Sequence, residues 1–206
     1  MLVSVLAFVG AASLVILLPG PDTLVVLRSL LREGPRSARR TALGVVTGLS
    51  IWAGAAVLGL SALLRASHDG YDALRLVGAV YLCAMGVQAL RSRGASAELD
   101  GSRPNRRPAL GTGYLGGLAT DLLNPKVGVF FVTFLPAFVP HGEPVGTTTL
   151  LLGAIFAVET GLYFVVFLRF ARHIVGWLGR PKLRKALDRG TGAVLIGFGL
   201  RLALEP

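Results

Sequence analysis

The sequence predicts an all-α membrane protein with six transmembrane helices. Of its 206 residues, 53% are hydrophobic and only 16% are charged, and the apolar residues gather in long runs, as in membrane-embedded chains. The runs lie at about 2–27, 41–64, 73–91, 111–139, 147–168 and 190–204. A helix needs roughly 20 residues to cross a hydrocarbon core of ~30 Å. The first five runs are long enough to span, and the sixth is shorter and carries Arg201.

The first run has no basic segment before it and is longer than a signal-peptide core. We therefore expect a retained transmembrane helix at this end of the chain, and not a cleaved targeting segment.

The positive charges predict an orientation in the membrane. The formal charge is +10, and the basic residues cluster in alternate loops: five between 28 and 40, five between 91 and 107, and seven between 169 and 189. The positive-inside rule then places these three loops in the cytoplasm and both termini outside. This distribution accounts for the basicity without nucleic acid as a partner, while attraction to anionic membrane lipid is expected.

A polar segment at 92–110 divides the chain into two halves, 1–91 and 111–206, within a single polytopic transmembrane domain. With three helices each, the halves would enter the membrane from opposite sides and form two inverted three-helix repeats. A shift of 106 residues places Pro19 over Pro125. Proline or glycine breaks in corresponding helices of two halves point to a transporter binding site. Broken first and fourth helices are therefore expected.

The first break lies at Pro19–Gly20–Pro21. Proline lacks an N–H group and clashes with the preceding turn, so the helix must be interrupted, and the freed backbone groups must face protein or a wet cavity. The restarting half-helix presents its positive end to that cavity. Asp22 has two interpretations: a helix cap, or a carboxylate that binds a cation or a proton.

The second break is predicted in the stretch "DLLNPKVGVFFVTFLP" at 121–136. It contains Asp121, Asn124, Pro125 and Lys126 in an apolar run, where ionisable residues usually pair or face water. Alternatives remain for each polar side chain: Asp121 could be interfacial, Asn124 could be helix punctuation, and Lys126 could either extend to the membrane surface or pair with a carboxylate.

Glu159 lies near the middle of the fifth run, next to Thr160 and close to Tyr163. An ionisable residue inside a membrane is a functional candidate by default, and the alternative is a structural pair with Lys126. Together with Asp22, Asp121 and Lys126, it forms a set suited to a zwitterionic solute. Because burial favours the neutral form of a carboxyl group, Asp22, Asp121 or Glu159 could carry a proton and couple transport to the proton gradient.

Other patterns are less specific. The pairs Gly44/Gly48 and Gly113/Gly117 permit close helix packing within the chain or across a homodimer. The phenylalanines at 130, 131, 134 and 138 are expected to pack or to face lipid, and the aromatic residues at 52, 81 and 163 could line a pathway.

Several function classes lack their sequence signals. A lone Cys83 excludes an internal disulfide or a dithiol redox centre. No nucleotide-binding motif, metal-ligand spacing or nucleophile motif is found, so we predict no enzyme activity, no catalytic residues, no cofactor and no metal site.

The stretch "LLPGPDTLVVLRSLLREGPRSARRTALGVVTGLSIW" resembles the first two helices of the LysE/RhtB family of bacterial amino-acid exporters. "GYLGGLATDLLNPKVGVFFVTFLPAFV" at 113–139 resembles the second signature of that family. The resemblance implies a bacterial inner-membrane exporter of amino acids or their derivatives, driven by the proton-motive force. It assigns to the binding site the motif residues Pro19, Gly20, Pro21, Asp22, Asn124, Pro125 and Lys126. Glu159 lies outside both motifs.

These inferences predict a secondary transporter in which both helix breaks face each other near the bilayer midplane. One alternative is a divalent metal-ion exporter, because Asp22, Asp121, Asn124 and Glu159 could supply oxygen ligands. Lys126 argues against this alternative, since a cation site gains nothing from a buried ammonium. A non-transporting membrane scaffold is a further alternative, and flux measurements on acidic-residue variants would distinguish it.

Overall fold

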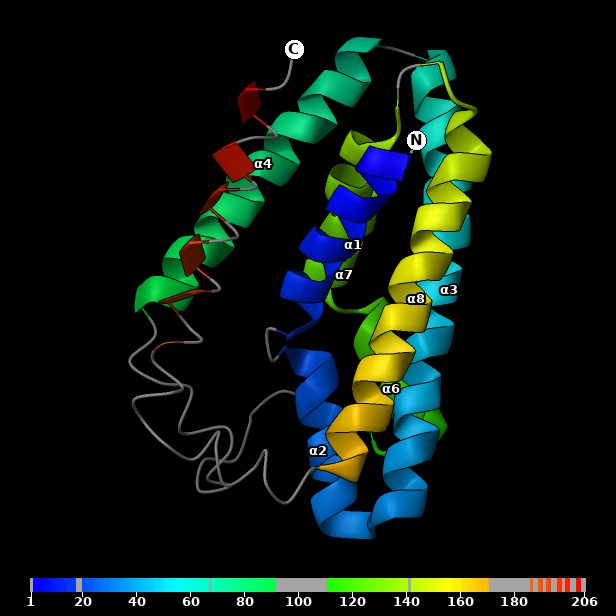
Figure 1. The fold of residues 1–206 in the computed structure, drawn as a ribbon, viewed down its shortest axis with the longest axis vertical. Coiled ribbons are helices and arrows are strands. Elements are labelled where there is room, and N and C mark those ends of the chain that lie inside the picture. Colours follow the sequence, from blue (N-terminus) through cyan, green and yellow to red (C-terminus); the bar gives the residue numbers. More distant parts are fainter. Residues whose placement is uncertain are drawn as a thin grey trace.

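The computed structural model describes residues 2–17, 20–66, 68–91, 111–140 and 142–170, with isolated positions between 186 and 204. Within these residues the fold consists of helices and short connections, with no strand (Figure 1). The helices are α1 (Leu2–Leu17), α2 (Pro21–Glu33), α3 (Pro35–Ala66), α4 (His68–Arg91), α6 (Gly113–Leu122), α7 (Pro125–Val129) and α8 (Val145–Arg169). A π-helical turn, η1 (Phe130–Phe134), and a 3₁₀ turn, η2 (Leu135–Phe138), continue α7. The prediction of an all-α membrane protein is confirmed.

Among the described residues, α3 (over Pro35–Gly59) and α8 are each long and apolar enough to cross a membrane, and two further spans result if each bent helix pair counts as one. The predicted run at 73–91 falls within α4, whereas the run at 190–204 lies largely outside the described residues. The described positions between 186 and 204 follow α4 (Figure 1), and Gly192 and Ile196 contact Gly86 of that helix. The six-helix count remains a prediction.

Both predicted helix breaks are present. The axes of α1 and α2 differ by 49°, and α6 meets the segment Pro125–Phe138 at 51°. Pro21 and Pro125 each occupy the first position of the restarting helix, after the N-cap residues Gly20 and Asn124, where a missing N–H costs nothing. Pro125 therefore matches Pro21 in helix position, whereas the sequence comparison set it over Pro19, two residues earlier. Pro19 itself lies outside the described residues.

Asp22 and Lys126 occupy the same position after their respective breaks. Each is the second residue of its restarting helix, so the two breaks carry opposite charges at equivalent positions.

Glycines bring α3 and α6 into close contact. A Cβ at Gly44 would collide with the carbonyl oxygen of Tyr114, and one at Gly117 with the carbonyl oxygen of Thr41. A Cβ at Gly48 would overlap the side chain of Asp121. These glycines therefore permit close helix packing within the chain, which was one of the two predicted alternatives. Gly113 differs, because it begins α6 with a φ of 75° and has open space around its Cβ position.

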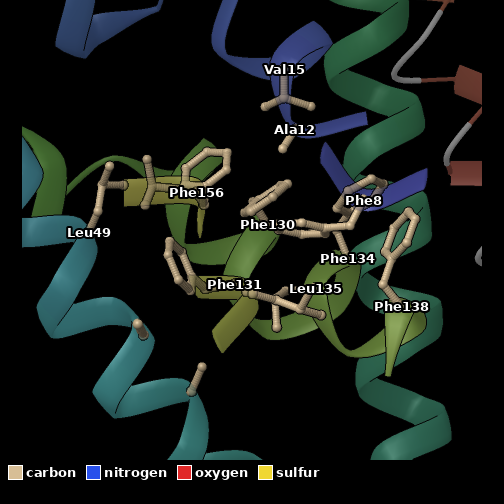
Figure 2. Packing of buried hydrophobic residues seen from close by; sticks show 14 of the residues in the cluster. Phe8, Ala12, Val15, Leu49, Phe130, Phe131, Phe134, Leu135, Phe138 and Phe156 are labelled. Atoms are coloured by element: carbon tan, nitrogen blue, oxygen red, sulfur yellow. The ribbon is translucent and has the colours of Figure 1, made fainter. Parts of the chain in front are cut away.

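The phenylalanines after the second break form the core of the bundle. Phe130, Phe131, Phe134 and Phe138 are 0–6% exposed and pack with Phe8 of α1 and with α3 and α8 (Figure 2). The rings of Phe130 and Phe156 stack with centroids 4.2 Å apart. The prediction that these phenylalanines pack inside the protein is therefore confirmed, and the lipid-facing alternative is wrong. Apolar side chains instead cover the outside, among them Leu6, Leu43, Leu58, Val158, Leu162 and Val165.

A hydrogen-bond network ties the turn between α2 and α3 to the start of α6. Buried Thr41 donates to Ser29 Oγ at 2.9 Å and accepts from the backbone N–H of Gly113 at 3.0 Å. Glu33 accepts hydrogen bonds from Ser37 and Thr112. This network lies at the end of the bundle where α8 also ends (Figure 1). The α2–α3 turn, the start of α6 and the end of α8, which adjoin the three basic loops, therefore lie at the same end of the bundle.

Candidate functional site

A pocket lies where the two helix breaks meet. Its cavity has a volume of about 50 Å³ and is partly open to the outside. Its polar lining comes from α2 and its cap, from the second break, and from α8: Gly20, Asp22, Thr23, Asn124, Lys126, Thr160 and Tyr163. Its apolar lining comprises Val15, Ile16, Val45, Leu49, Val127, Phe130, Phe156 and Phe164. Four of the seven predicted binding residues line this pocket: Gly20, Asp22, Asn124 and Lys126.

Asn124 joins the two breaks directly. Its Nδ2 donates to Asp22 Oδ2 at 2.7 Å, across 102 residues of sequence, and its Oδ1 accepts from the backbone N–H of Lys126 at 3.1 Å. Asn124 thus caps the restarting helix α7 and also forms a hydrogen bond to the other break. Gly20, and not Asp22, occupies the N-cap position of α2, and Asp22 is the second residue of that helix. The cap interpretation of Asp22 is therefore wrong.

Lys126 donates a hydrogen bond to a helical carbonyl that lacks its usual donor because of a proline. In a continuous helix the carbonyl of Val15 would accept from the N–H four residues later, but that residue is Pro19, which has none. Lys126 Nζ donates to this carbonyl at 2.9 Å and also interacts electrostatically with Asp22. The ammonium therefore points into the bundle beside the first break, and the predicted alternative of extension to the membrane surface is wrong.

Pro125, at the break between α6 and α7, leaves a second helical carbonyl without its usual donor. Pro125 cannot donate to the carbonyl of Asp121, which instead accepts from the Asn124 backbone at 3.0 Å and from the Trp52 indole at 3.4 Å. Trp52 does not line the pocket, and a role for it on a pathway stays a prediction.

Asp121 is buried behind the pocket, not in it. Its side chain is 0% exposed and lies against Gly48 of α3. Neither carboxyl oxygen has a hydrogen-bond partner among the described residues. Asp121 is therefore enclosed by protein, and its depth in the membrane stays a prediction.

Glu159 lies between α8 and α1, where Oε2 accepts from Ser13 Oγ at 3.2 Å and Oε1 is buried without a hydrogen-bond partner in the described part of the chain. It does not line the pocket, although the next residue, Thr160, does. The contact with Ser13 gives no support to a structural pair with Lys126.

Sequence reasoning missed the contribution of α8 to the pocket. Thr160 was noted only as a neighbour of Glu159, Tyr163 was named as a possible pathway residue, and Thr23 was not considered. Uncharged hydroxyl residues on an apolar helix carry no strong signal. The spacing of Phe156, Thr160 and Tyr163 at one helical turn was the only available sign of a shared face.

Pro21 and Pro125 are exposed and do not line the pocket. They begin the two restarting helices and so set where the breaks fall.

Comparison of the sequence with known proteins shows its family. Residues 13–206 match the family described as LysE type translocator. The chain belongs to that family. The translocator is 29% identical to an uncharacterized membrane protein, YrhP, of Bacillus subtilis (strain 168), over 98% of this chain and 99% of the relative. It is 32% identical to the threonine efflux protein of Escherichia coli (strain K12), over 91% of both chains.

A third relative of the translocator is the homoserine/homoserine lactone efflux protein of Salmonella typhi, 27% identical over 96% of this chain and 94% of the relative. No solved structure matches the translocator. The resemblance to LysE/RhtB exporters is thus confirmed, and the translocator is an integral membrane protein. Membership in a family of efflux proteins points away from an enzyme.

Proposed function

We propose that the translocator exports amino acids or amino-acid derivatives from the cytoplasm as a secondary transporter in the bacterial inner membrane. The observation that carries this proposal is the polar pocket at the meeting point of both helix breaks, with Asp22, Asn124 and Lys126 inside an otherwise apolar bundle. The efflux of threonine and of homoserine by relatives supports the same substrate class.

The pocket carries groups of both charges, as a zwitterion requires. Asp22 Oδ2 is engaged by Asn124, whereas Oδ1 is buried without a hydrogen-bond partner in the described residues. Oδ1 would accept from the substrate ammonium. Lys126 and the first N–H groups of α2 would hold the carboxylate, since a helix N-terminus favours anions. Gly20 would let the substrate approach the backbone.

The prolines complete the proposed binding set without touching the substrate. Pro21 and Pro125 begin the restarting helices, and Pro19 removes the N–H that would otherwise occupy the Val15 carbonyl. The same residues that break the helices therefore make room for Lys126 inside the bundle.

Coupling to proton influx forms the next part of the proposal, with Asp22, Asp121 and Glu159 as candidate carriers. An isolated ionised carboxylate is the costliest group to bury. Both oxygens of Asp121 are buried without partners in the described residues, whereas Asp22 and Glu159 each accept a hydrogen bond. Asp121 is therefore best accommodated as a neutral, proton-carrying acid in this conformation, and would ionise in a conformation that lets water reach α6.

Alternating access would follow from movement of two inverted halves, 1–91 and 111–206, about the pocket. The similar bends of 49° and 51° and the equivalent positions of Asp22 and Lys126 support this symmetry. The basic loops would lie in the cytoplasm and both termini outside. A homodimer no longer draws support from Gly44, Gly48 and Gly117, which are used within the chain.

Export of a divalent metal ion is disfavoured by the pocket. Hard cations require several convergent oxygen ligands, whereas Lys126 places an ammonium beside Asp22. Among the described residues, no group of three histidine, cysteine, aspartate or glutamate side chains converges on one point.

The test is efflux from proteoliposomes loaded with a mixture of amino acids, with and without an imposed pH gradient, followed by mass spectrometry. Asp22→Asn and Lys126→Met are compared with wild type. Glu143→Gln, a carboxylate in the loop before α8, is the matched control. Wild type and the control should release one or a few amino acids only when the gradient is present. Loss of one charged hydrogen bond predicts rates roughly 10- to 100-fold lower in the two pocket variants.

Each alternative outcome has a definite meaning. Normal export by both pocket variants would move the binding site elsewhere. Export that persists after a protonophore would remove proton coupling but leave amino-acid export. Release of added divalent metal alone would replace the proposal with the metal exporter, and no release of any solute would favour the scaffold.

A further inference from the structure

We infer that Thr160 determines specificity by forming a hydrogen bond with the side chain of the transported amino acid. The inference rests on the proposed function and names a contact within the same pocket. Thr160 lines the pocket and is only 7% exposed. Its Oγ1 is buried and has no hydrogen-bond partner among the described residues.

This hydroxyl differs from those of Thr47 and Thr120 in the same bundle. A helical threonine commonly donates to the carbonyl four residues earlier. Thr47 donates in this way to Leu43 at 2.9 Å, and Thr120 to Gly116 at 2.7 Å. Thr160 forgoes the equivalent bond, although a buried hydroxyl without a partner is destabilising. A ligand in the pocket would supply the missing partner.

The arrangement of the pocket walls indicates which part of the ligand Thr160 would meet. Asp22, Asn124 and Lys126 come from the two breaks, so the α-ammonium and α-carboxylate of an amino acid would be held there. Thr160 and Tyr163 come from α8. A substrate held by its α-groups would therefore extend its side chain toward α8.

The rest of the pocket lining is apolar and includes Phe130, Phe156 and Val127. It suits the carbon atoms of a short side chain. Tyr163 OH lies 3.5 Å from Thr23 Oγ1 and so has a potential partner within the protein, whereas Thr160 Oγ1 has none in the described residues. The geometry thus favours a small amino acid whose side chain carries a hydrogen-bonding atom such as a hydroxyl.

Threonine and valine form the sharpest substrate pair for a test, because they have nearly the same shape and differ by one hydroxyl. Proteoliposomes that contain both at equal concentration are assayed for the initial ratio of threonine to valine efflux. A site that hydrogen-bonds a substrate hydroxyl rejects the analogue that lacks it. With one such bond, wild type should favour threonine by on the order of 10-fold or more.

Thr160→Val removes the protein hydroxyl while keeping the β-branched shape. It should reduce the threonine-to-valine ratio by about the wild-type preference, chiefly by slowing threonine efflux. Thr160→Ser keeps the hydroxyl and should retain the preference.

Thr149 supplies a matched control. It lies 11 residues earlier on α8, on nearly the same face three turns away. It is fully buried and its hydroxyl also has no partner in the described residues, but it does not line the pocket. Thr149→Val should leave the ratio unchanged.

An unchanged ratio in Thr160→Val, or an equal shift in Thr149→Val, would overturn the inference, since the effect would then be absent or due to helix packing. Equal release of threonine and valine by wild type would overturn it too, while amino-acid export would stand. If wild type releases no amino acid, the proposed function fails and the inference fails with it.

Discussion

Exchanging Asp22 and Asn124 between the two helix breaks tests the contact on which the pocket depends. In the structure Asn124 donates to Asp22 at 2.7 Å while its Oδ1 accepts the N–H of Lys126. Asn124→Asp keeps an oxygen for the Lys126 N–H but removes the donor to Asp22. Two carboxyl groups then face each other.

The magnitude follows from these distances. A hydrogen bond to a charged group contributes about 1.5–3 kcal/mol. Two ionised carboxylates about 4 Å apart repel by about 4 kcal/mol at an effective dielectric constant of 20, unless one of them binds a proton. For a chain of this length, a loss of about 3 kcal/mol lowers the melting temperature by roughly 6–12 °C.

The double exchange Asp22→Asn with Asn124→Asp restores one donor and one acceptor with their roles reversed. We expect it to recover most of the stability that Asn124→Asp loses, because the carboxylate introduced at position 124 can still accept from the Lys126 N–H. Asp22→Asn alone should cost about 1 kcal/mol, since two amides can still form a neutral hydrogen bond.

The assay is the apparent melting temperature of each purified variant in the same detergent, followed by intrinsic fluorescence and by retention of the monodisperse peak after heating. If the double variant is as unstable as the sum of the single variants, the two side chains do not interact. The contact between the breaks would then be refuted, together with the pocket built on it.

Three further stability changes follow from close contacts. Gly48→Ala places a Cβ against the carboxyl group on α6 and should destabilise the protein by about 1–3 kcal/mol or more. Gly54→Ala is its control and should be neutral or stabilising, because nothing lies within 4 Å of its Cβ position. Equal melting temperatures of the two variants would contradict the α3–α6 packing. Thr41→Val removes two hydrogen bonds that link separate helices and should cost about 2 kcal/mol, while Thr47→Val, which loses one bond within its own helix, should change the melting temperature little. Trp52→Phe removes the indole donor to the carbonyl at the second break and should cost up to about 1 kcal/mol, and a loss of several kcal/mol would show that packing, not this bond, dominates.

The helix breaks could be predicted from the sequence because their cause is local. A proline lacks its N–H in every environment, so Pro21 and Pro125 interrupt a helix regardless of what surrounds them. Their equivalence was harder to predict. The sequence comparison paired Pro125 with Pro19, whereas the observed helix starts give Pro21 and Pro125 the same position.

The roles of the polar side chains could be predicted less well, because the sequence allowed a purely structural role for each of them. Asp22 could have been a cap, and Asp121 could have been interfacial. The outcome depended on burial and on partners from other helices. Asp121 is buried because Gly48 lets α3 approach α6, and that approach cannot be deduced from the neighbours of Asp121 in sequence.

By itself the sequence determined the class of the protein, the family, the approximate helices and the positions of both breaks. These properties arise from runs of apolar residues and from proline chemistry, which act over a few turns of chain. Only the tertiary structure decided which groups meet. The partners Asp22 and Asn124 are 102 residues apart, and Lys126 and the Val15 carbonyl are 111 apart. Such pairs form because helix packing brings the two breaks together, and packing depends on the shape of every helix face at once.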